Sequence, residues 1–320
     1  MKPLNQKIFG ASGSVRRPVI FMIIALIISG IVAPSFLTGR NINALLVSSS
    51  FLVVITIGEA LVIMTGMIDL GVESVLASGG MLVAFLSVLK HVPSGEAIPL
   101  TLVGGLVVGL VAGLLVTKGR IPSFIVTLGT YWGFKGIALL FHGGNYISPN
   151  SGAFSFSGLA GYFLGIPTLV IIMVVLVAAA QILLSYTPIG TWVKSVGSNE
   201  MSAKTVGLNI NAIKIAMFMV SGLLAAFAGI LMAAWQGSMY PTTGAGYSLQ
   251  AIAAVILGGI PFTGGRGTIV GAALGALIIG LISDIIVLLG LPSLYEYIFV
   301  AVILIIAGLQ ARAAASGVVK

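Results

Sequence analysis

Charged side chains inside apolar runs are the first candidates for chemistry in this sequence. Only 7% of its 320 residues are charged, yet five charges interrupt long apolar stretches: Glu59, Asp69, Glu73, Lys135 and Asp284. A charge at membrane depth is costly and usually faces a bundle interior, a cavity or a solute path. The structural alternative is a capped turn at Asp69 and Glu73, and pairing of Lys135 with a neighbouring helix. We favour that alternative for Glu73 and Asp284, and both interpretations stay open for Glu59 and Asp69.

The residue patterns of common enzymes are absent from the sequence. It has no G-x-x-x-x-G-K-[ST] phosphate loop, no G-x-S-x-G elbow and no H-E-x-x-H zinc motif. It has no cysteine, and its two histidines, His91 and His142, stand far apart without ligand spacing. We therefore expect no catalytic residue, no metal site and no cofactor in this chain, and a membrane-embedded enzyme is disfavoured.

The apolar runs that carry these charges predict the fold. The chain is 58% hydrophobic, and its mean hydropathy is +1.19. Continuous apolar stretches of about 20 residues favour helices over a barrel, because each helix crosses the bilayer with its backbone satisfied. We predict an all-α integral membrane protein of about ten transmembrane helices, forming a single transmembrane domain over residues 1–320. The runs fall near 18–37, 43–66, 71–90, 98–117, 122–142, 166–186, 212–235, 248–262, 268–289 and 294–310.

The positions of the basic residues predict the orientation. They gather in the N-terminal segment 1–17 and then in every second connection, at Lys118, Arg120, Lys194, Lys204, Lys214 and Arg266. This is the positive-inside bias of an even number of spans, with both the N- and C-termini cytoplasmic. The net charge of +8 then indicates cytoplasmic loops rather than nucleic-acid binding. The opposite segments, 143–165 and 236–248, would be either a landing surface outside the cell or ordinary connections.

One compact polar block interrupts the apolar pattern, within the cytoplasmic connection 187–211. From residue 197 it reads "GSNEMSAKTVGLNINAIK". Ser198 and Asn199 are good N-cap residues, Glu200 falls in the first turn, and Gly207 ends the helix. We predict a short helix that is presented to a partner, because a plain loop would not need these caps.

This block resembles the coupling segment of the sugar-type ABC importer permeases, the ribose permease family. The matching pattern is G-x-N-E-x-x-A-x-x-x-G-[LI]-N, followed here by "IKIAMFMVSGLLAAFAGIL". Three further stretches resemble the family in order: "LVIMTGMIDLGVESVLASGG", "KGRIPSFIVTLGT" and "PTTGAGYSLQAIAAVILGGIPFTGGRGTIVGAALGALIIG". Glu73 departs from the usual Gly, Glu59 from a small or neutral residue and Gln250 from Glu, and "IPFTGG" replaces the usual "TSLxGG". These departures bear on the solute rather than on the family.

The resemblance implies a transport subunit and its partners. In that family the short helix docks on a separate ATPase subunit, which would hold the ATP and Mg. A second permease subunit, identical or paralogous, and a periplasmic or lipid-anchored solute-binding protein are implied as well. The implied location is the bacterial inner membrane, in contact with lipid and without nucleic acid. The ATPase-coupling residues would be Gly197, Asn199, Glu200, Ala203, Lys204, Gly207, Leu208 and Asn209.

A path for a neutral polar solute needs hydroxyl, amide and aromatic groups, and it need not bind tightly when a separate protein supplies specificity. We predict translocation-path positions at Glu59, Thr65, Asp69, Phe124, Thr127, Asn145, Gln236, Tyr240 and Gln250. The expected solute is a monosaccharide or similar small polar molecule, such as a pentose, a hexose, a furanose or a furanosyl signal.

Other transport functions stay open at this point. The chain could be a permease for nucleosides or branched-chain amino acids. It could also be a proton-coupled secondary transporter with Asp69 or Glu59 as the proton carrier. A secondary transporter would not need a capped cytoplasmic helix, which favours the importer.

Overall fold

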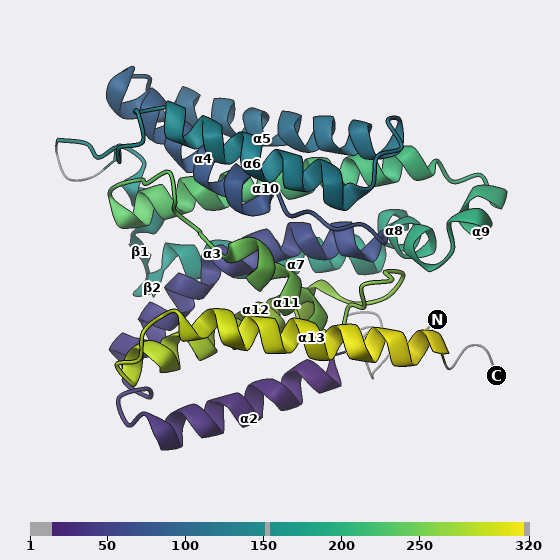
Figure 1. Ribbon diagram of the computed structural model, residues 1–320. Coiled ribbons are helices and arrows are strands. Elements are labelled where there is room, and N and C mark those ends of the chain that lie inside the picture. The colour runs from purple at the N-terminus through teal and green to yellow at the C-terminus, as the bar shows by residue number, and fades with distance from the viewer. Residues whose placement is uncertain (1–14, 151–153, 317–320) are drawn as a thin grey trace. The chain divides into compact units, whose positions relative to one another are not determined.

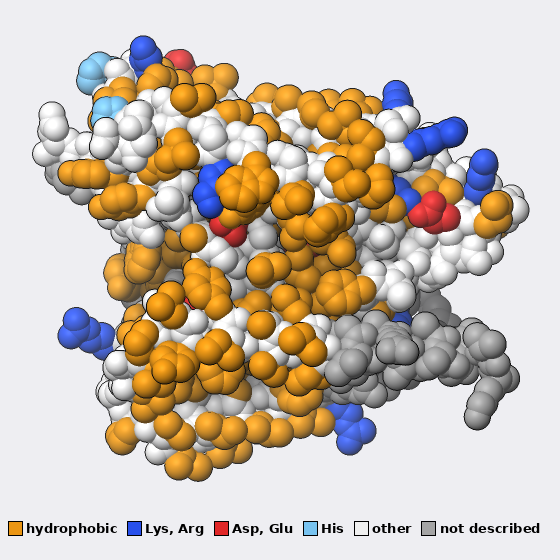
Figure 2. Space-filling model, in the orientation of Figure 1, with side chains coloured by type: hydrophobic (Ala, Val, Ile, Leu, Met, Phe, Trp, Pro, Cys, Tyr) orange, Lys and Arg blue, Asp and Glu red, His pale blue; other side chains and the backbone are white. Residues whose placement is uncertain are grey.

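The described chain is mostly helical and has only two short strands, which agrees with the all-α prediction (Figure 1). The computed structural model describes residues 15–150 and 154–316, without the side chains at 17 and 307–316. The predicted N-terminal segment 1–17 therefore lies, up to residue 14, outside the described residues. Hydrophobic side chains cover most of the surface in view, as expected for helices that face lipid (Figure 2).

Seven described helical segments are long and apolar enough to cross a membrane. They are α3 (Gly39–Met64), α4 with η1 (Val72–Ala84, Phe85–Leu89), α5 (Ser94–Thr117), α6 (Ser123–Leu140), α7 (Thr168–Tyr186), α10 (Ile210–Gln236) and α12 (Ile269–Leu288). Three shorter apolar stretches lie in α2 (Arg16–Val32), α11 (Tyr247–Leu257) and α13 (Tyr295–Ser316). Each of the ten predicted runs thus coincides with a helix, and seven of those helices meet the length of a full span.

The chain forms two compact units, and each unit combines stretches that are distant in sequence. Unit 1 takes its described residues from 1–66, 175–208 and 249–320. Unit 2 takes its described residues from 67–174 and 209–248.

Unit 2 is built around α10, which packs against α4 and α5 (Figure 1). The contacts are between backbones: a Cβ atom at Gly222 of α10 would overlap the Gly105 carbonyl oxygen of α5. A Cβ atom at Gly229, two turns further along α10, would overlap the Leu76 carbonyl oxygen of α4. Small residues allow this close packing, which in lipid replaces the hydrophobic effect as the force between helices.

Unit 1 is held by α3 and α12, which pack side by side, with α2 against α12. An apolar cluster of Ala33, Phe36, Leu45 and Leu281 joins these three helices. The start of α12 is fixed by the amide of Gln181 on α7, whose Oε1 accepts hydrogen bonds from the backbone N–H groups of Ile269 and Val270 at 2.9 Å and 3.1 Å. A buried amide that satisfies two free N–H groups of a helix start is stabilising.

Two non-helical breaks interrupt the spans of the molecule. The predicted run 248–262 ends as a helix at Leu257, and the glycine-rich segment 258–267 follows it as a break. Four of its glycines have positive φ, namely Gly259, Gly264, Gly265 and Gly267. The other break, 65–71, separates α3 from α4. Irregular backbone at membrane depth must be buried in protein or line a cavity, so both breaks need protein partners.

Candidate functional site

The polar block forms two helices, α8 (Pro188–Ser198) and α9 (Glu200–Thr205), both in unit 1. Asn199 is the N-cap of α9, because its Oδ1 accepts a hydrogen bond from Ser202 N at 2.9 Å. At the other end Gly207 has φ of +83°, with Gly207 N bonded to Lys204 O at 3.0 Å and Leu208 N to Ala203 O at 3.1 Å. These bonds make a Schellman motif. The predicted short helix is therefore confirmed, with Asn199 rather than Ser198 as its cap.

Helix α8 was missed by the sequence interpretation, which treated residues 187–197 as connection. The signal for it was present, because Pro188 follows Thr187 and proline favours the first helical position. Its Lys194 is half-buried, and that burial lowers the pKa of the amine. Burial disfavours the charged form of Lys194, so this residue is not a fully exposed basic group.

Gly197 is positioned as a packing residue. It lies at the end of α8, where a Cβ atom would overlap the Met64 carbonyl oxygen at the end of α3. Gly265 N donates to the same carbonyl oxygen at 2.9 Å, and Ser198 Oγ donates to Gly265 O at 3.2 Å. The end of α8 therefore packs against the end of α3 and is hydrogen-bonded to the glycine-rich break at 258–267.

The surface of α9 carries exposed apolar side chains that sequence reasoning did not single out. Met201 and Val206 are 73% and 74% exposed, whereas Ala203 between them is buried. Glu200 and Lys204 lie on the exposed side of the same helix. Exposed apolar groups beside charges are typical of an interaction surface. Leu208 closes the Schellman motif, and Asn209 caps α10 by accepting from Ala212 N at 3.0 Å.

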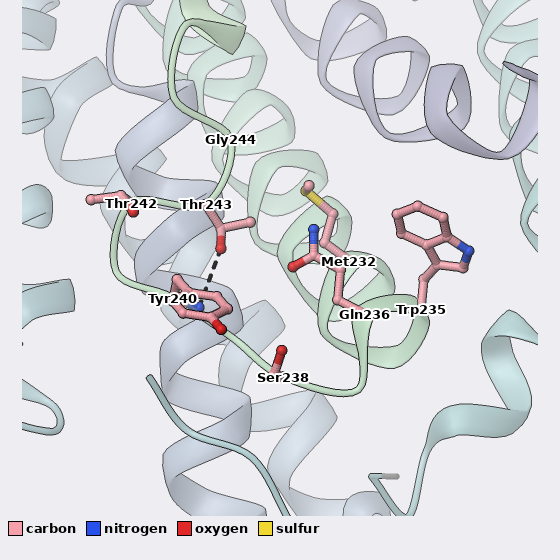
Figure 3. Close-up of a pocket in the computed structure, with 8 residues that line it drawn as sticks. All are labelled: Met232, Trp235, Gln236, Ser238, Tyr240, Thr242, Thr243 and Gly244. Atoms are coloured by element: carbon pink, nitrogen blue, oxygen red, sulfur yellow. Dashed lines mark hydrogen bonds between the residues drawn. The ribbon is translucent and has the colours of Figure 1, made fainter. Parts of the chain in front are cut away.

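A pocket of about 570 Å³ lies in unit 2, where α10 ends and the loop 237–246 begins (Figure 3). Its lining residues are neutral: Met232, Trp235, Gln236, Ser238, Tyr240, Thr242, Thr243 and Gly244. The Gln236 amide points towards the loop, and the Trp235 indole points away from it (Figure 3). Thr243 Oγ1 accepts from Tyr240 N at 3.2 Å, which shapes the turn. The volume lies within the usual range of small-molecule sites, about 300–1,000 Å³.

The pocket loop is tied to the other predicted external segment. Ile147 and Met239 form a β-bridge with two backbone hydrogen bonds of 2.9 Å each. Tyr240 stacks on Tyr146, with ring centroids 5.3 Å apart. The segment 143–165 also contains the turn η2 (Ser157–Ala160) and the strand β1 (Tyr162–Phe163), which pairs with β2 (Ile166–Pro167) directly after the segment. The two predicted external segments are therefore joined at Tyr146 and Ile147, next to a residue that lines the pocket.

The predicted path residues do not all meet in one place. Gln236 and Tyr240 line the pocket. Asn145 is exposed and precedes Tyr146, whose ring stacks on Tyr240. In unit 2, Asp69 is buried and accepts from Ser221 Oγ and Gly71 N, both at 2.9 Å. Thr127 is buried with its hydroxyl bonded to Ser123 O at 2.9 Å, whereas Phe124 is exposed on the same helix.

The remaining three predicted path residues lie buried in unit 1. Glu59 is fully buried in α3, and Thr65 ends that helix with its hydroxyl bonded to Val62 O at 2.7 Å. Gln250 is 5% exposed, and its Nε2 donates to Glu296 Oε1 at 3.0 Å. Asp284, for which the structural interpretation was favoured, accepts from Asn41 Nδ2 at 2.8 Å. These hydrogen bonds indicate a structural role for Thr65, Gln250 and Asp284.

Comparison with known proteins places this architecture in a family. The family model described as branched-chain amino acid transport system / permease component matches residues 41–308. The ribose import permease protein RbsC of Bacillus subtilis is 39% identical over 296 residues, covering 92% of both chains. RbsC of Haemophilus influenzae is 37% identical over 91% of both chains. The L-arabinose ABC transporter permease protein AraH of Azospirillum brasilense is 34% identical over 90% of this chain and 84% of the relative.

No solved structure matches the chain. The family match covers most of the sequence, and these relatives exceed 30% identity over nine tenths of it. The chain therefore belongs to the family of transport-system permease components, among the sugar-type ABC importer permeases, as a transport subunit and not an enzyme.

Proposed function

We propose that the chain is the membrane subunit of a bacterial inner-membrane ABC importer for a monosaccharide or similar small polyhydroxylated solute. One observation carries the importer mechanism: α9 is a helix capped at both ends that exposes Met201 and Val206. A six-residue helix is too short to be stable by itself. Its two caps and its exposed apolar side chains therefore fit a rigid knob that enters a cleft on a cytoplasmic ATPase.

The pocket supports the solute class. Its lining offers an indole, a phenol, an amide and three hydroxyl groups and no charged side chain. Sugar rings present C–H faces to aromatic groups and hydroxyls to amide and hydroxyl partners. A branched-chain amino acid would bring an ammonium and a carboxylate, which would be left without charged partners among these residues. The uncharged lining thus favours a neutral polyol over an amino acid.

The proposed transport cycle couples the pocket at one end of α10 to the segment that precedes its other end. Helix α10 is 27 residues long, so its pocket end lies about 40 Å from the end that follows α9. In this proposal the ATPase dimer, which holds ATP and Mg, closes and moves the α8–α9 segments of two permease subunits together. The path between the subunits then opens outward to accept solute from a binding protein, and hydrolysis resets it. Ten spans, cytoplasmic termini and either an identical or a paralogous second subunit belong to the same proposal.

The test is co-purification with the ATPase subunits of the same cell, followed by ATP hydrolysis in lipid. Met201→Asp with Val206→Asp should abolish binding of the ATPase while membrane insertion is kept, because two charges would enter an apolar cleft. Thr191→Asp, which adds a charge at an exposed position of α8, is the matched control and should keep binding. ATPase binding that survives the double substitution would contradict the coupling role of α9.

A further inference from the structure

Lys135 on α6 is held by aromatic groups of its own helix. Its Nζ donates to Tyr131 Oη at 3.1 Å and lies 5.1 Å and 5.5 Å from the ring centroids of Tyr131 and Trp132. Positions three and four residues apart share a helix face, so the three side chains form one cluster.

The acidic member of the cluster, Glu73 at the start of α4, has both carboxylate oxygens occupied. Oε1 accepts from Tyr131 Oη at 3.4 Å, and Oε2 accepts from Gly246 N at 2.9 Å. Gly246 lies two residues after Gly244, which lines the pocket. Ser248 Oγ donates to Leu70 O at 2.8 Å and accepts from Glu73 N at 3.2 Å. Glu73 therefore anchors the pocket loop and balances the charge of Lys135, and all of these groups belong to unit 2.

The Lys135 side chain runs back along its own helix, in the direction in which helical side chains usually tilt. Lysines near helix ends usually extend towards the nearer interface. Lys135 is five residues from the end of α6 at Leu140, yet its amine bonds to Tyr131, one turn in the opposite direction. The amine is thus directed away from the nearer helix end, towards Tyr131 and Trp132.

The cluster has unused binding capacity. A lysine ammonium has three N–H donors, and the bond to Tyr131 uses one. The indole of Trp132 beside it is 63% exposed. Donors next to an open aromatic face suit a neutral molecule that presents hydroxyl oxygens on its edge and C–H groups on its face.

We propose that Lys135, Tyr131 and Trp132 form a second station for a neutral polyhydroxylated solute, next to the pocket loop. The proposal rests on the proposed importer function, because a free-standing lipid-facing helix would have no such solute. Glu73 is its positioning residue: it orients Tyr131 and neutralises the site, so that a neutral solute is preferred to an anion.

The first experiment asks whether this face of α6 meets water, and it needs no known solute. The natural chain has no cysteine, so single cysteines can be placed without a background. Leu128→Cys and Gly136→Cys flank Trp132 by one turn, and no atom lies within 4 Å of a Cβ at Gly136. Val107→Cys and Val111→Cys on α5 are the controls, because these valines are 46% and 50% exposed.

The expected result is a reaction of both α6 cysteines with a charged, membrane-impermeant thiosulfonate at least tenfold faster than that of the α5 cysteines. A thiol must ionise to react, which lipid suppresses. Equal rates on the two helices would overturn the proposal, because α6 would then face the same surroundings as α5.

The second experiment measures uptake of labelled D-ribose and L-arabinose by the reconstituted complex, together with its ATP hydrolysis. Lys135→Met should lower uptake roughly tenfold, as expected for losing hydrogen bonds to a charged donor, while solute-stimulated hydrolysis stays within about twofold. Lys135→Arg and Trp132→Phe should retain most uptake, and Trp132→Ala should not. Unchanged uptake in Lys135→Met, or equal loss of uptake and hydrolysis in the methionine and arginine variants, would contradict the station.

The two proposals fail in different ways. If the importer function is wrong, the unmodified chain will bind no ATPase and show no stimulated hydrolysis, and the station, which rests on that function, is then wrong as well. If only the station is wrong, the unmodified chain will couple normally and Lys135→Met will behave like it.

Discussion

Gly197 has a structural role that its place in the coupling motif does not reveal. The residue is enclosed by Met64 O and Gly265 N, so it has no room for a side chain. The predicted coupling residues thus separate into groups that build α9 and groups that could touch a partner. Asn199, Ala203 and Gly207 build α9, and Gly197 packs the end of α8 against α3. Glu200 and Lys204 are exposed, next to Met201 and Val206, which were not among the predicted coupling residues.

Gly197→Ala should destabilise the protein by about 1–3 kcal/mol, the usual cost of inserting an atom into packed surroundings. The reason is that the end of α8 must move away from the backbone of α3. Thermal unfolding in detergent checks this. Gly129→Ala is the control, because no atom lies within 4 Å of a Cβ there, and it should stay within about 0.5 kcal/mol of the natural chain. Equal melting temperatures for both variants would contradict the packing role of Gly197.

At the scale of the element, the two caps of α9 determine whether the segment is a helix at all. The first N–H groups of a helix have no partner within the helix. In α9 one of them, Ser202 N, donates to the N-cap residue at Asn199 Oδ1. The positive φ of Gly207 allows the Schellman turn at the other end. Without them, the exposed apolar side chains would be carried by a loop.

Asn199→Ala should weaken α9 by about 1 kcal/mol, so that its backbone amides exchange with solvent roughly fivefold faster. Hydrogen exchange of the peptide 199–208, read by mass spectrometry, measures the effect. Ser202→Ala keeps the backbone N–H that the cap binds and should exchange like the natural chain. Indistinguishable exchange in the two variants would mean that the cap does not hold the helix.

At the scale of the whole molecule, the orientation still rests on the charge pattern and the proposed function. If α9 is cytoplasmic and the segment 143–165 is external, a cysteine at Gly158 will react with an impermeant reagent in intact cells. A cysteine at Ser202 will react only after the membrane is opened. Both positions are exposed, and the natural chain gives no background because it lacks cysteine. Labelling of Ser202→Cys in intact cells would invert the proposed topology.

The sequence by itself determined the membrane-helical class, the capped helix at 199–207 and the family, because each depends on local patterns. Continuous apolar runs need helices, and an Asn–Glu start with a glycine end specifies a short helix wherever it lies. The sequence also predicted Gln236 and Tyr240 as path residues, and these two residues, which are close in the chain, both line the pocket.

Only the tertiary structure decided which polar residues are free to act. Thr65, Asp69, Thr127 and Gln250 have the right chemistry for a path, but neighbours distant in sequence or one turn away occupy their hydrogen bonds. Glu73 and Lys135 are 62 residues apart in the sequence. Both form hydrogen bonds with Tyr131 Oη because α4 and α6 pack together. Helical periodicity fixes what a residue shares with its own helix, whereas its partners on other helices depend on close packing of whole elements.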